Sequence, residues 1–225
     1  MNASGAAAGR HTGPAMLSRF LERRAPRPPG EQCEMCAEPL DAGHPHIADL
    51  GQRSVMCACR GCYLLFTGEG AAGGRYVSIP ERYLHDPRFP LSEARWDELG
   101  IPVAMVFLLR NSEQQRTIAL YPSPAGATEA AVPDGLAAEL PRLNPAFADL
   151  ADDVEALLLR RRAGSFECFL LPVDACYRLT GLIRTRWKGF DGGEEAWTAI
   201  DSFFADLRER SRPASRGDAP EDGDE

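Results

Sequence analysis

Five cysteines fall within thirty residues, in the order Cys33-x2-Cys36, a gap of twenty residues, and Cys57-x-Cys59-x2-Cys62. Two residues between a pair of cysteines allow both thiolates of a tight turn to face one ion, and the gap has the length of a hairpin. The pattern therefore predicts a tetrahedral metal site with the ligands Cys33, Cys36, Cys59 and Cys62.

Four thiolates suit a closed structural zinc site, and they also suit the single iron of a rubredoxin-like electron-transfer protein. Zinc is favoured because rubredoxin knuckles carry proline and glycine beside the cysteines, whereas these read Cys33-Glu34-Met35-Cys36 and Cys59-Arg60-Gly61-Cys62. A module of about forty residues buries too little apolar surface to be stable alone, so metal binding would supply its folding energy. We expect removal of one ligand to unfold it.

Two further residues are candidate auxiliary metal ligands, Cys57 and His46. Cys57 lies two residues before Cys59 on a predicted strand and would point to the same side, as an alternative ligand, a reactive thiol or a small buried residue. His46, with His44 beside it across Pro45, could join Cys57 in a second, more open site, or the two histidines could be a hydrogen-bonded or exposed pair.

The elements that would position these ligands lie in residues 31–74. Two short strands, His46–Leu50 and Arg53–Cys57, are predicted to form a hairpin. The apolar run Tyr63–Phe66 fits a short helix that the second cysteine pair opens. A knuckle, a hairpin and a helix with the last two ligands resembles the treble-clef or zinc-ribbon type of four-cysteine metal module.

Residues 75–210 are predicted to form an α+β domain with an antiparallel sheet and C-terminal helices. Its predicted strands are Arg75–Ile79, Pro102–Leu109, Thr117–Tyr121 and Phe166–Leu171, and the second and third of these are expected at the centre of the sheet. Its predicted helices are Ser92–Gly100, Asp134–Leu140, Asp149–Arg160, one that begins after Pro172 and one that follows Gly192-Gly193. Cys168 and Cys176 lie among apolar neighbours and are expected in the core.

The ends of the chain are predicted to be disordered tails, residues 1–30 and the acidic residues 211–225. No apolar run approaches the roughly 20 residues that span a bilayer, and the N-terminus does not read as a signal peptide. We therefore expect a cytoplasmic protein without a membrane span. Paired cysteines in a reducing compartment indicate metal or redox chemistry more often than disulfides.

The charge and the motifs narrow the functional classes. The chain has 25 basic and 33 acidic side chains, a net charge of −8, which disfavours a nucleic-acid partner and makes a nucleic-acid-binding regulator a weaker alternative. No nucleophile elbow, dinucleotide fingerprint or His-Glu-x-x-His motif is present, so we expect no enzyme, a thiol enzyme centred on Cys57 being the weakest alternative. The basic and aromatic run Arg184–Phe190 could be a docking surface for an acidic partner or simply the end of a helix.

The cysteine pattern with His44-Pro45-His46, Arg75-Tyr76 and Ile79-Pro80-Glu81-Arg82, and the stretch from Cys176 to Gly193, resemble an uncharacterised actinobacterial protein family, a domain of unknown function. The resemblance covers residues 31–210. Members of this family are often encoded beside uptake NiFe hydrogenases and iron–sulfur assembly proteins. The resemblance implies an accessory role in maturation or electron delivery, with a hydrogenase or its maturation proteins as the protein partner. The cysteine cluster, the acidic charge and the absence of a catalytic set add the expectation that this accessory protein is non-catalytic and binds zinc.

Overall fold

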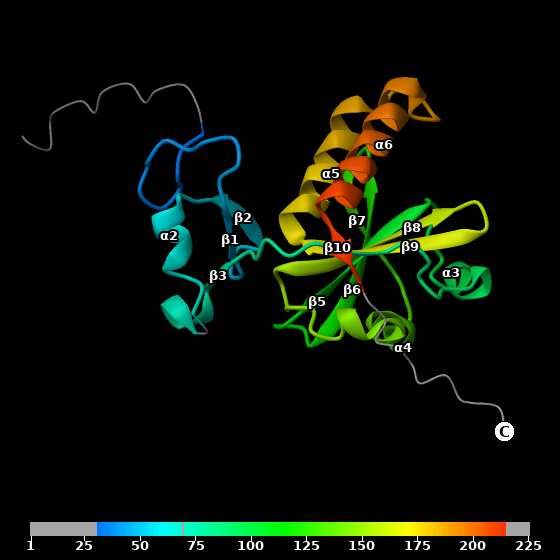
Figure 1. Cartoon of the computed structure of the whole chain (residues 1–225), viewed down its shortest axis with the longest axis horizontal. Helices are drawn as coiled ribbons and strands as arrows, with labels where there is room; N and C mark the ends of the chain where they lie inside the picture. Colours follow the sequence, from blue (N-terminus) through cyan, green and yellow to red (C-terminus); the bar gives the residue numbers. More distant parts are fainter. Residues whose placement is uncertain (1–30, 69, 215–225) are drawn as a thin grey trace, which may run out of the picture.

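A computed structural model of the chain describes residues 31–68 and 70–214. The predicted tail 1–30 and most of the predicted acidic tail, residues 215–225, lie outside the described residues. Two sheets organise the rest, with the cysteine-rich module at one end of the molecule and a larger domain at the other (Figure 1).

The module contains a three-stranded antiparallel sheet in the order β2-β1-β3. Its elements are β1 (His46–Asp49), β2 (Ser54–Cys57), α2 (Arg60–Leu64), η1 (Ala71–Gly74) and β3 (Tyr76–Ser78). The predicted hairpin and short helix are confirmed. The strand at Tyr76–Ser78, expected in the larger domain, pairs with β1 instead, so the module's sheet continues past the predicted boundary at residue 74.

The larger domain is built on a seven-stranded sheet in the order β10-β4-β9-β8-β5-β6-β7, antiparallel except for the short β10–β4 pair. Its strands are β4 (Leu84–Asp86), β5 (Met105–Asn111), β6 (Arg116–Ser123), β7 (Gly126–Ala130), β8 (Glu155–Arg162), β9 (Ser165–Pro172) and β10 (Arg212–Pro213). Its helices are α3 (Glu93–Glu98), α4 (Asp134–Glu139), η2 (Leu140–Leu143), η3 (Pro145–Phe147), α5 (Val173–Arg186) and α6 (Gly193–Arg210). The α+β class with C-terminal helices is thus confirmed.

Helices cover both faces of this sheet (Figure 1). Side chains alternate between the two faces along each strand, so each strand contributes to both cores. Phe107, Leu158 and Phe169 face α5 and α6 and pack against their buried stripes. On the other face Leu108 and Leu157 pack within a second core, to which α3, α4 and the 3-10 turns contribute.

The predicted helix at Asp149–Arg160 is wrong. Residues Glu155–Arg162 are the strand β8, which pairs with β5 on one side and β9 on the other. The run from Ala156 to Leu159 is completely buried, since both faces of the sheet are covered. A strand buried on both faces loses the alternation of apolar and polar residues, so it resembles a helix in sequence.

The module packs against the larger domain through a small apolar cluster. Ala48 of β1 and Ile79, after β3, are buried with Val154 and Val173, which precede β8 and open α5. The start of α5 is therefore held close to the hairpin. No described helix combines the length and the apolar character needed to cross a membrane.

Candidate metal centre

The first cysteine pair lies in a tight turn before the hairpin. The amide of Cys33 donates to the carbonyl of Glu38 at 2.8 Å, and the amide of Ala37 donates back to the carbonyl of Cys33 at 2.7 Å. Ala37 closes the turn with a φ of 65°, in the left-handed region. Cys33 is buried and Cys36 is exposed, so the turn presents its two thiols at different depths.

The second pair opens the helix α2. Cys59 is the N-cap residue, and its Sγ accepts the amide N–H of Cys62 at 3.5 Å. Sulfur at an N-cap takes the place that a serine or aspartate oxygen usually holds, and here the same atom faces the first pair. The Sγ atoms of Cys36 and Cys59 lie 3.6 Å apart.

The four predicted ligands converge. The sulfur atoms of Cys33, Cys36, Cys59 and Cys62 all lie within 4.8 Å of one another. A tetrahedral zinc–thiolate site with bonds of about 2.3 Å separates its sulfurs by about 3.8 Å. The donor set and its spacing therefore fit a tetrahedral ion with little rearrangement.

The four thiols shift one another's pKa values, and a bound cation would favour the thiolate form of each. Burial alone would raise the pKa of Cys33, but amide donors from Cys59, Cys36 and Met35 outweigh it and lower that pKa to about 6. Burial and the neighbouring thiols raise the pKa of Cys62. One thiolate thus forms readily and the next does not, because like charges accumulate in a small volume. A bound divalent cation allows all four to ionise.

Cys57 lies outside this group. It occupies the last position of β2, directly opposite His46 of β1, and it forms a second group with His44 and His46. The expectation that Cys57 and Cys59 lie on one strand is wrong, because β2 ends at Cys57 and Cys59 is the N-cap of α2. Cys57 and His46 lie together, which is one of the alternatives that the sequence left open.

The other two cysteines lie in the two cores, as expected. Cys168 of β9 belongs to the core beneath α3 and α4, and Cys176 of α5 to the core beneath α5 and α6. Neither has any exposed surface, and burial raises the pKa of both thiols well above the ordinary value. They are inert packing residues.

The basic and aromatic run Arg184–Phe190 ends α5. Trp187 packs against the core and beside Trp197, whereas Phe190 is completely exposed. Lys188 and Arg186 both contact Glu195 of α6. One carboxylate therefore offsets part of the positive charge of the run.

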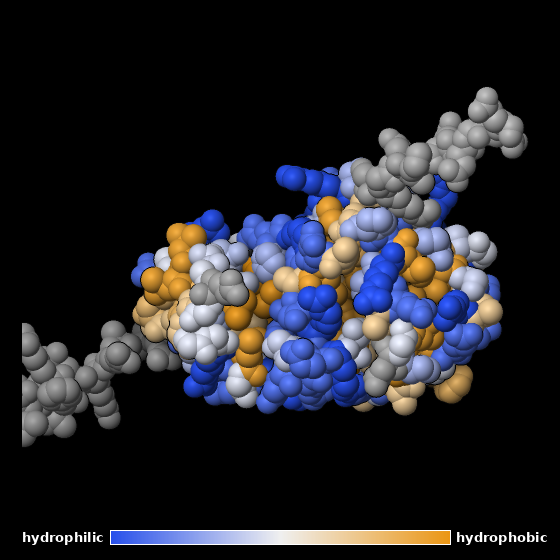
Figure 2. All heavy atoms as spheres, turned by 90° about the horizontal axis from the view of Figure 1, so that it is seen from below, coloured by the Kyte–Doolittle hydropathy of each residue, from blue (hydrophilic) through white to orange (hydrophobic). Residues whose placement is uncertain are grey.

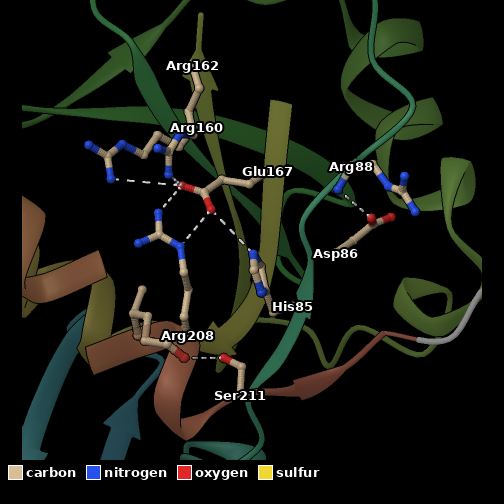
Figure 3. Close-up of polar contacts among 9 residues, drawn as sticks. His85, Asp86, Arg88, Arg160, Arg162, Glu167, Arg208 and Ser211 are labelled. Atoms are coloured by element: carbon tan, nitrogen blue, oxygen red, sulfur yellow. Dashed lines mark hydrogen bonds and ion pairs between the residues drawn. The ribbon is translucent and has the colours of Figure 1, made fainter. Parts of the chain in front are cut away.

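Sequence reasoning missed a buried polar cluster in the larger domain. Glu167 of β9 accepts two hydrogen bonds from the guanidinium of Arg208, with His85, Arg160 and Arg162 around it (Figure 3). A lone glutamate in an apolar strand is the only local signal, and its partners come from three other elements. The cluster joins α6 to the strands β4, β8 and β9 and has a structural role.

A family of unknown function, DUF5947, matches the chain over residues 32–211. Since this is most of the chain, the protein belongs to that family. The predicted resemblance to a family of unknown function is confirmed to this extent. Neither the curated proteins nor the solved structures contain a match.

Proposed function

We propose that this DUF5947 protein is a non-catalytic metal-binding accessory protein, whose module holds one structural zinc ion and presents a surface to a protein partner. The observation that carries the proposal is the convergence of four cysteine sulfurs within 4.8 Å from two separate turns. Zinc would be held by Cys33, Cys36, Cys59 and Cys62. Four protein thiolates leave no coordination position for a substrate, which is the mark of a structural site.

The module depends on such an ion because its own core is small. The buried members of its hydrophobic cluster are Cys33, Ile47, Ala58 and Tyr63, and one of these is a ligand. A metal ion that crosslinks the knuckle to α2 replaces the missing apolar contacts. The last two ligands lie at the start of a helix after a hairpin, which supports a treble-clef module.

A partner surface is supported by apolar side chains around the module. Leu64 and Leu65, at the end of α2, are 53% and 68% exposed, and Met35 in the knuckle is 36% exposed. Figure 2 shows apolar atoms gathered at the module's end of the molecule. Contiguous exposed apolar patches commonly mark protein interaction sites. The resemblance described above supports a hydrogenase or its maturation proteins as the partner.

Metal analysis of protein purified without oxygen tests the zinc site. We expect tightly held zinc, with the ion of the four-cysteine site lost in Cys36→Ser but kept in Cys168→Ala, which removes a cysteine outside the module. Wild-type protein that retains no metal, or Cys36→Ser protein that retains all of it, would contradict the structural site.

The visible absorption of the same purified protein separates zinc from iron. Iron in four thiolates gives a visible absorption that bleaches on reduction, whereas zinc is colourless. A red protein that loses its colour on reduction would contradict the structural zinc site and favour an iron site for electron transfer.

The accessory role needs a test in cells. Where the gene accompanies an uptake hydrogenase, we expect its deletion to lower hydrogenase activity, with rescue by the wild-type gene and by Cys168→Ala but not by Cys36→Ser. Full hydrogenase activity in the deletion strain would remove this role and leave metal binding intact.

A further inference from the structure

We propose a second metal site in the module, in which His44, His46 and Cys57 bind one divalent transition-metal ion and leave a coordination position open. One ligand atom of each residue lies within 4.8 Å of the others. This group shares no residue with the four cysteines, so both sites can be filled at once. The inference goes beyond the structural zinc and the accessory role.

The hairpin register creates the site. His46 and Cys57 are direct cross-strand partners in β1 and β2, which places their side chains side by side on one face of the sheet. His44 lies two residues before His46, and the two rings are 4.9 Å apart at an angle of 60°. The backbone beyond this point is fixed by the amide of Ala58, which donates to the carbonyl of Pro45 at 3.0 Å.

The ring of His44 is set up as a metal ligand. Its side chain is only 7% exposed, and its Nδ1 lies 2.7 Å from the carbonyl oxygen of Asp41. A carbonyl can only accept, so Nδ1 carries the hydrogen and the neutral ring keeps its lone pair on Nε2. That Nε2 is buried without a hydrogen-bond partner among the residues that the structure describes. An unpartnered buried polar atom is unfavourable, and a metal ion would satisfy it.

The ring of His46 is oriented by a carboxylate. Its Nδ1 lies 2.8 Å from Oδ2 of Asp174, in the first turn of α5. This leaves Nε2 as the free atom, the arrangement in which a carboxylate holds a histidine for a metal and increases its basicity. Asp174 is a positioning residue that belongs to the larger domain.

The ligand set identifies the class of ion. Two imidazoles and one thiolate suit zinc and its neighbours cobalt, nickel and copper, and disfavour magnesium and calcium. Three protein ligands with a fourth position for water or another small ligand is the pattern of a reactive site. His46 and Cys57 are partly exposed, so the ion can be reached from solvent.

Metal stoichiometry of the full chain is the test. Protein purified without oxygen and loaded with zinc should hold two ions. His44→Gln and Cys57→Ser should each hold one, with far-ultraviolet circular dichroism that matches wild type. His85→Gln, which removes a histidine of the larger domain, should hold two.

The number of bound ions distinguishes failure of the second site from failure of the four-cysteine site. One ion in wild type that survives Cys57→Ser overturns the second site and leaves the four-cysteine site standing. One ion that Cys57→Ser removes overturns the four-cysteine site and keeps the second. Two ions in both His44→Gln and Cys57→Ser also overturn the inference.

Cobalt tests the open position. In wild-type protein loaded with two cobalt ions, added azide should change the visible spectrum, and in cobalt-loaded Cys57→Ser it should change nothing. A wild-type spectrum that azide leaves unaltered would overturn the open position.

Discussion

Nδ1 of His46 on β1 lies 2.8 Å from Oδ2 of Asp174 on α5, and this contact joins the cysteine-rich module to the larger domain. It lies beside the apolar cluster of Ala48 and Val173 that packs the two parts together. The histidine and cysteine group is therefore held by the module on one side and by the first turn of α5 on the other. A movement of the module relative to the larger domain would change the geometry of the proposed second site.

Substitution of Asp174 should weaken the second site. We expect Asp174→Ala to bind the second ion about 10–100-fold more weakly, because His46 loses the carboxylate that orients its ring. Competition with a chromophoric chelator measures the change. Asp174→Asn retains an oxygen acceptor and should recover part of the affinity. Equal affinity in all three proteins would show that the contact does not act on the metal.

Chelation should unfold the module alone. Hydrogen exchange of the reduced protein with a strong chelator should show rapid exchange in residues 33–66, with β8 and β9 still protected. The larger domain has two cores of its own, whereas the described part of the module has one small cluster of its own and shares a second with the larger domain. Equal loss of protection in β8 would indicate that the two parts unfold together.

Loss of the buried carboxylate should destabilise the larger domain. Glu167→Ala removes the carboxylate that pairs with Arg208, and we expect the free energy of unfolding to fall by about 3 kcal/mol. Glu113→Ala, which breaks a pair with Arg53 on the surface, should change it by no more than about 1 kcal/mol. Urea denaturation measures both. Similar small changes would mean that the buried cluster contributes little.

The same carboxylate predicts how stability varies with pH. Burial would raise the pKa of Glu167, but the His85 ring 3.3 Å away, the hydrogen bonds from Arg208 and the nearby arginine charges lower it from 4.5 to about 2. A carboxyl with a lowered pKa stabilises the fold above about pH 4.5, and this contribution is lost as the pH falls toward 2. Between pH 5 and 3, Glu167→Gln should therefore lose less stability than wild type. Parallel curves for the two proteins would contradict this origin.

A glycine at the start of α6 should not tolerate a side chain. Gly192 has a φ of +88°, and a Cβ there would lie 2.9 Å from ring atoms of Trp187. Gly189 also has a positive φ, of +66°, but open space around it. We expect Gly189→Ala to cost about 1 kcal/mol through backbone strain and Gly192→Ala about 2 kcal/mol more through the clash. Thermal unfolding compares them, and equal costs would show that Trp187 simply moves aside.

Local spacing determined the four-cysteine site. A spacing of two residues between cysteines predicts a tight turn. The hairpin between the two pairs and the short helix at the second pair were also predicted, because each depends on residues close in sequence. The association of His46 with Cys57 followed from the same hairpin. The family resemblance rested on the cysteine pattern together with the stretch from Cys176 to Gly193.

The tertiary structure decided what distant residues do. The helical composition of Glu155–Arg162 gave no sign of the strand β8, because burial by helices on both faces overrides helix propensity. Nothing near Asp174 or Glu167 in sequence indicates their partners. The pairs form only when the folded chain brings separate elements together, and the buried setting then makes their polar contacts matter. The sequence by itself determined which residues could bind metal, and the packing of α5 against the hairpin, which brings Asp174 to Nδ1 of His46, decided that Nε2 of that ring faces a possible ion.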